Sequence, residues 1–95
     1  MSERVAIDEN SVPRFRPHMK LRFDKRRDRW VVLAPERLFV PDEIALEILR
    51  RCDGVASVTA IVDDLARLSG APRGEIMGDV RTLLQELTDK GVLAA

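Results

Sequence analysis

The chain has 95 residues, of which 45% are hydrophobic and 34% charged, and its formal net charge is zero. A chain of this length without internal repeats forms one domain and buries about 60–65% of the surface of its unfolded state. Its apolar content excludes a disordered protein. No apolar stretch approaches the roughly 18 residues of a membrane span, and the N-terminal residues lack the basic and apolar segments of a secretory signal, so we expect a cytoplasmic protein.

Metal binding and catalysis have few candidate residues. Cys52 is the only cysteine and His18 the only histidine, which leaves too few sulfur and nitrogen ligands for a zinc site. The sequence contains no glycine-rich phosphate loop, no tyrosine and no Ser/His/Asp set. We expect Cys52 in the core and His18 on the surface, and we expect no metal, no cofactor and no enzymatic activity.

The charges are unevenly divided along the chain. Up to Arg37 there are ten Lys and Arg against six Asp and Glu, whereas from Leu38 onward there are six against ten. The basic part includes "DKRRDR" at residues 24–29, which is typical of a nucleic-acid contact or of a solvated hairpin turn. Charge pattern alone favours the turn.

Three short strands are predicted after a flexible N-terminal arm at residues 1–12. Apolar and basic residues alternate in "HMKLRFD" at residues 18–24, and "RWVVL" at residues 29–33 is the returning strand. A third strand, "RLFV" at residues 37–40, ends at Pro41, because proline lacks the amide hydrogen that a sheet needs.

Three helices follow the strands. Asp42 fits the N-cap of the first helix, and Gly54 is placed to end it. The second helix begins near Ser57 and ends at Gly70, and the third occupies residues 72–90, with proline in its first turn. The positions expected to face the core in the first two helices are Ile44, Ile48, Leu49, Cys52, Val58, Ile61, Val62, Leu65 and Leu68.

The third helix has a wide apolar face. Its central stripe consists of Ile76, Val80, Leu83 and Leu87. At about 100° per residue, Met77 and Leu84 widen the face on one flank, with Arg81 beyond them, whereas the opposite flank is acidic. A face wider than one stripe usually contacts two elements, although packing of Met77 and Leu84 on the second helix alone would also explain the width.

The predicted fold is α+β, a small winged-helix-like domain with a three-stranded antiparallel sheet followed by three helices. A winged-helix protein that binds DNA should present basic residues on its third helix. Residues 73–90 contain three basic side chains against four acidic ones. Nucleic-acid binding is therefore an alternative that would depend on residues 25–29 alone.

Three segments carry a resemblance to a known family. They are "HMKLRFDKRRDRWVVLAPERLFVPDEIALEILRRCDG", "SVTAIVDDLARLSGAPRGEI" and "DVRTLLQELTDKGVL", with "LAPER", "CDG" and "IVDDL" as the most specific parts. Residues 13–95 thus resemble the PqqD family of pyrroloquinoline quinone biosynthesis. The resemblance implies a RiPP recognition element, a non-catalytic domain that binds the ribosomally made precursor peptide PqqA and presents it to the radical S-adenosylmethionine enzyme PqqE.

The resemblance also implies a binding mode, in which the peptide adds as a further strand to the sheet edge beside the third helix. The alternative is that the short third strand is only a blunted sheet edge. The residues expected to bind the peptide are Arg37, Leu38, Phe39, Val40, Met77, Val80, Arg81 and Leu84. The basic residues expected to contact the partner enzyme are Lys25, Arg26, Arg27 and Arg29.

Overall fold

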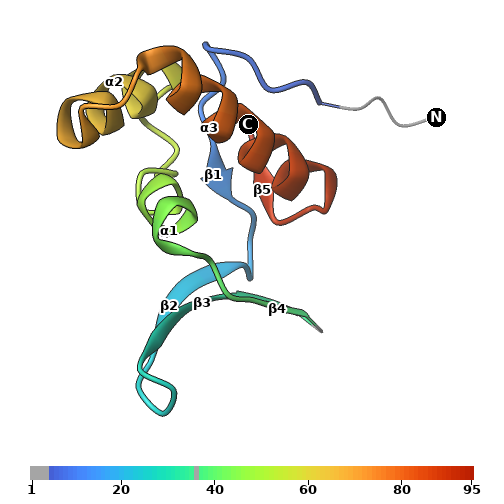
Figure 1. Ribbon diagram of the computed structural model, residues 1–95. Helices are drawn as coiled ribbons and strands as arrows, with labels where there is room; N and C mark the ends of the chain where they lie inside the picture. The colour runs from blue at the N-terminus through green and yellow to red at the C-terminus, as the bar shows by residue number, and fades with distance from the viewer. Residues whose placement is uncertain (1–4, 36) are drawn as a thin grey trace.

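The computed structural model describes residues 5–35 and 37–95. The elements in chain order are β1 (Arg14–Phe15), β2 (Lys20–Asp24), β3 (Arg29–Ala34), β4 (Arg37–Phe39), α1 (Glu43–Leu49), α2 (Val58–Ser69), α3 (Arg73–Asp89) and β5 (Leu93–Ala94) (Figure 1). Strands β2, β3 and β4 form one antiparallel sheet in that order, and β1 pairs with β5 in a second sheet. The predicted α+β fold is confirmed. None of the described helices is long and apolar enough to span a membrane.

The register of the three-stranded sheet decides which side chains of β4 face the core. Leu21 pairs with Val32, and Val32 pairs with Phe39, so these three side chains share one face. Val32 is buried in the core cluster and Phe39 packs against it. Leu38 pairs with Leu33 on the outer face and is 46% exposed.

Side-chain caps begin the first two helices at the predicted residues. The Asp42 carboxylate accepts a hydrogen bond from Ala45 N–H at 2.8 Å, and the Ser57 hydroxyl accepts one from Ala60 N–H at 3.1 Å. Gly70 ends α2 in the left-handed conformation, with φ of 70°. Helix α1 ends earlier than predicted, at Leu49, because the Asp53 carboxylate holds a turn through Val55 and Ala56 N–H, each at 2.9 Å.

Residues 5–12, expected as part of a flexible arm, contact the core and α2, whereas residues 1–4 lie outside the described part of the chain. Ile7 is 3% exposed and belongs to the core cluster. The carbonyls of Ser11 and Glu9 accept hydrogen bonds from Val58 and Thr59 N–H, at 2.8 and 3.0 Å. This segment therefore covers the N-terminus of α2, where backbone N–H groups would otherwise lack partners.

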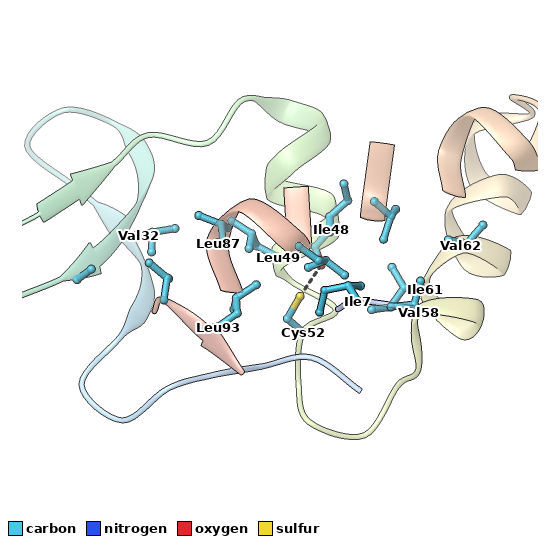
Figure 2. Packing of buried hydrophobic residues seen from close by; sticks show 14 residues of the cluster. Ile7, Val32, Ile48, Leu49, Cys52, Val58, Ile61, Val62, Leu87 and Leu93 are labelled. Carbon is cyan, nitrogen blue, oxygen red and sulfur yellow. Dashed lines mark hydrogen bonds between the residues drawn. The ribbon is translucent and has the colours of Figure 1, made fainter. Parts of the chain in front are cut away.

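One core joins both sheets and all three helices (Figure 2). Val32 of β3, Leu87 of α3 and Leu93 of β5 belong to it, and Figure 2 shows Ile7 within the same cluster. Cys52 is buried as predicted, and its thiol donates to the Ile48 carbonyl at 3.4 Å. Two residues predicted to face inward do not, since Ile44 is 65% and Leu68 70% exposed.

Candidate functional site

Strand β4 is an edge strand of its sheet, and within the described chain only β3 pairs with it. Its three residues are followed closely by Pro41, so the free edge is short. The edge lies near the C-terminal end of α3, because the Lys90 ammonium lies 5.5 Å from the centroid of the Phe39 ring (Figure 1). Unpaired backbone groups of β4 and side chains of α3 therefore border the same space.

A hollow of about 350 Å³ lies between α1 and α3. Its lining begins at Asp42, the N-cap of α1, shortly after the end of β4. Asp42 and Ala45 line it from α1 and its N-cap, and Thr82, Leu83 and Glu86 line it from α3. We call this the edge hollow. Leu83 is half-buried and gives it an apolar wall.

The residues predicted on α3 lie elsewhere on that helix. Val80 and Leu84 are fully buried in the core, and Val80 also lies in the wall of a hollow between α1, α2 and α3. Met77 is half-buried against the core cluster, and the Arg81 guanidinium donates to the Ile7 carbonyl at 3.2 Å. At about 100° per residue, Arg81 is roughly 160° around the helix from Leu83.

The N-terminal segment accounts for the wide apolar face of α3. Ile7 N–H donates to Gln85 Oε1 at 2.9 Å, and Gln85 Nε2 donates to the Val5 carbonyl at 2.7 Å. These bonds hold residues 5–7 along the flank of α3 that carries Arg81. The structure therefore places Met77, Val80, Arg81 and Leu84 in the core or beside residues 5–7. At the end of α3, Lys90 contacts Phe39 of β4, and Leu83 and Glu86 line the edge hollow.

The predicted residues of the strand lie together on the open edge, on two different faces. Phe39 turns toward the core and α3, whereas Leu38 lies on the outer face of the sheet. Val40 follows β4 and is 50% exposed, and Arg37 is also exposed. A strand added at this edge would direct alternate side chains toward α3 and away from it.

Acidic side chains predominate around the edge hollow. Asp42, Asp79 and Glu86 line it, and Lys90 forms an ion pair with Glu86 at 2.8 Å. Within the described chain Asp79 takes part in no ion pair. The acidic flank was visible in the sequence of α3, but the pattern alone does not reveal which flank lies beside β4.

The predicted enzyme-contact residues lie at the turn between β2 and β3, which extends away from the helices (Figure 1). Lys25, Arg26, Arg27 and Arg29 are all exposed. The Asp24 carboxylate shapes the turn by accepting hydrogen bonds from Arg26 N–H at 3.0 Å and Arg27 N–H at 3.4 Å. A second hollow, of about 460 Å³, adjoins the turn on the outer sheet face and has Val31, Leu33 and Leu38 in its lining.

No group of three or more potential metal ligands occurs within residues 5–35 and 37–95. Burial raises the pKa of the Cys52 thiol to about 12, and the nearby Asp53 carboxylate adds to this shift. Cys52 is therefore a neutral core residue and not an activated nucleophile.

Comparisons with known proteins agree on one family. The model for coenzyme PQQ synthesis protein D (PqqD) matches residues 29–93. A curated relative from Rhodopseudomonas palustris strain HaA2, named PqqA binding protein, is 53% identical over 97% of this chain and 90% of its own length.

Two solved structures share the fold. The PqqD part of PqqCD from Methylobacterium extorquens, described as a functional and stand-alone RiPP recognition element, has a TM-score of 0.80 at 36% identity. The match covers 95% of this chain and 96% of the Methylobacterium extorquens chain. Lasso peptide synthetase B1, solved with a leader peptide, has a TM-score of 0.75 at 17% identity over 90% of this chain and 100% of its own, a likeness of fold alone.

Proposed function

The chain belongs to the PqqD family, and from this premise we propose that it is a non-catalytic peptide chaperone in the cytoplasm. It binds the precursor peptide PqqA as a strand added to β4 and presents it to the radical S-adenosylmethionine enzyme PqqE. The observation that carries this proposal is the free edge of β4 next to the edge hollow. The names of the relatives, PqqA binding protein and RiPP recognition element, support the peptide as ligand.

Backbone pairing alone would bind the peptide weakly. About three to five new hydrogen bonds at roughly 0.5–1.5 kcal/mol each give about 2–7 kcal/mol. Association costs about 4–15 kcal/mol, and ordering a flexible peptide adds to that cost. Side chains of the peptide must therefore bury apolar surface, and about 300 Å² would contribute roughly 7 kcal/mol.

The contacts available to those side chains follow from the strand register. Inward-facing side chains of the peptide would meet Phe39 and Leu83, and Lys90 lies above the Phe39 ring. Outward-facing side chains would lie beside Leu38 and Val40, which are both exposed large aliphatic residues. Acidic residues at the edge hollow favour basic residues in the bound segment.

Affinity for synthetic PqqA, measured by isothermal titration calorimetry, tests this assignment. A glutamate in the apolar contact should weaken binding about 10- to 100-fold in the Leu83→Glu and Val40→Glu variants, since burying one aliphatic side chain contributes roughly 1.5–3 kcal/mol. Val55→Glu is the matched control, because Val55 is 82% exposed and lies in the turn after α1. Unchanged affinity in both edge variants, with folding verified by circular dichroism, would exclude the β4 site.

Contact with PqqE is assigned to the basic turn, because an added strand at β4 leaves that turn free. Reversing two charges with Arg26→Glu and Arg27→Glu should weaken enzyme binding, most strongly at low salt, and leave PqqA binding intact. The double variant Arg16→Glu and Arg67→Glu is a control with the same net charge. Equal enzyme affinity for both double variants would refute the assignment.

A further inference from the structure

A third, larger hollow lies where α1, α2 and α3 meet. Its volume is about 500 Å³, within the range of roughly 300–1,000 Å³ that is usual for ligand sites. Aliphatic residues form most of its lining, among them Leu65, Leu68, Ala71 and Ile76. We call this the helix hollow.

The helix hollow is open to solvent because two large aliphatic residues at its border do not reach the core. Ile44 of α1 is 65% exposed and Leu68 of α2 is 70% exposed. Their positions in the helix patterns would normally turn them inward. Two such residues bordering one hollow on a small domain indicate a binding surface better than an isolated exposed leucine would.

The helix hollow is continuous with the edge hollow beside β4. Ile44, Ile48 and Asp79 line both of them. The edge hollow also includes Asp42, which follows β4 by three residues in the chain. A peptide paired with β4 that continues past the C-terminal end of this strand would thus pass along α1 and reach the helix hollow.

Acidic side chains border this route. Glu47 is shared by two arginines, Arg50 at 3.6 Å and Arg51 at 2.9 Å. Glu43 and Asp79 form no ion pair within residues 5–35 and 37–95. The position of Glu43 in the first turn of α1 suits the helix dipole, but Asp79 lies in the middle of α3 and has no such explanation.

From these features we propose that the helix hollow binds a bulky apolar side chain of the precursor peptide, adjacent to a lysine or arginine that Asp79 and Glu43 attract. The inference rests on the proposed function, because pairing with β4 is what brings the peptide to the hollow. It divides recognition into two parts. Backbone pairing at β4 places the peptide, and the apolar side chain in the helix hollow selects its sequence.

A double-mutant cycle tests the apolar contact. The Leu68→Glu variant should bind full-length PqqA about 10- to 100-fold more weakly than the wild-type protein, and Val55→Glu should bind it equally well. PqqA variants with single bulky apolar residues replaced by alanine identify the partner residue. For one of these peptides the wild-type and Leu68→Glu proteins should have the same affinity. If Leu68→Glu lowers the affinity for every peptide by the same factor, the proposal is overturned.

The charge contact has its own test. The Asp79→Lys variant should weaken PqqA binding with a clear salt dependence, whereas Glu75→Lys, one turn earlier on α3, should not. If both variants bind PqqA as the wild type does, the proposed contact between Asp79 and a basic residue of the peptide is refuted.

Two further outcomes separate this inference from its premise. Leu83→Glu weakening PqqA binding while Leu68→Glu leaves it unchanged would overturn the helix hollow and retain the β4 site. No binding by the wild-type protein would overturn both. The remaining alternative is that a second copy of the protein fills the helix hollow. Sedimentation equilibrium of the free protein tests it, because a dimer that dissociates in the Leu68→Glu variant would show that a second copy fills the hollow.

Discussion

Two adjacent aspartates of α2 fasten this helix to two different neighbours. Asp64 Oδ2 accepts from Arg51 Nε at 2.6 Å, which joins α2 to the residues after α1, and Asp63 Oδ1 accepts from Arg73 Nε at 2.7 Å, which joins α2 to α3. The hydrogen bond from Arg51 holds the pKa of Asp64 below its usual value. The segment "IVDDL" thus combines buried aliphatic residues with one contact to α3 and one to the segment after α1.

The segment "CDG" has three separate structural roles. Cys52 fills the core, and Asp53 accepts two backbone hydrogen bonds that turn the chain after α1. Gly54 has φ of 78°, and a Cβ atom there would lie 3.4 Å from Cβ of Arg14. Glycine therefore suits this position for its left-handed backbone conformation, whereas a Cβ atom there would be in ordinary contact with Arg14.

Burial of Cys52 makes the stability of the folded protein fall with rising pH in the alkaline range. Its pKa rises from 9.0 to about 12 in the folded protein, so the folded state retains a proton that the unfolded state releases. The stabilisation is fully present below pH 9 and is lost as the pH rises toward 12. Between these values the free energy of unfolding should fall more steeply in the wild-type protein than in Cys52→Ala.

Urea unfolding followed by the fluorescence of Trp30, the only tryptophan of the chain, measures this difference. Parallel curves for the two proteins across that pH range would contradict the burial of a neutral thiol.

At the scale of secondary structure, local signals predicted most elements. Alternating apolar residues indicated β2, branched residues indicated β3, and Asp42, Ser57 and Gly70 set three helix ends through hydrogen bonds or backbone conformation within the same segment. The two strands of the second sheet were missed. Each has two residues, too few for any periodicity, and β1 and β5 pair only because distant parts of the chain meet.

The structural surroundings of the proposed peptide site were predicted only in part, for a related reason. The identity of the edge strand follows from its length and from Pro41, but the orientation of α3 depends on tertiary contacts. Helical periodicity showed how wide its apolar face is, whereas the burial of Ile7 decides which flank is covered. Residues 5–7 lack a pattern of their own, so the sequence could not reveal that Arg81 is already occupied.

The exposure of Ile44 and Leu68 has a similar origin. Helix α1 has only seven residues and ends at Leu49, so the last helical turn predicted before Gly54 is absent. Local periodicity placed both side chains on inner faces. In the structure they border the helix hollow instead.

For the whole molecule, the proposed function requires the edge of β4 to bind a peptide without pairing two copies of the protein. Strand β4 has three residues, charged Arg37 begins it, and Pro41 follows soon after, which limits self-association. In the proposed binding mode, the edge hollow and helix hollow extend the contact beyond this short strand. Specificity then comes from side-chain contacts that a second copy of β4 would not make.

The most direct test of the added strand is a titration of isotope-labelled protein with unlabelled PqqA, followed by nuclear magnetic resonance. We predict amide shifts at residues 37–42 and 82–90, and nuclear Overhauser contacts between the peptide backbone and the amides of β4. A short DNA duplex should cause no shifts. Shifts confined to residues 25–29, or to Arg81 and Gln85 on the opposite flank of α3, with β4 unaffected, would contradict the account.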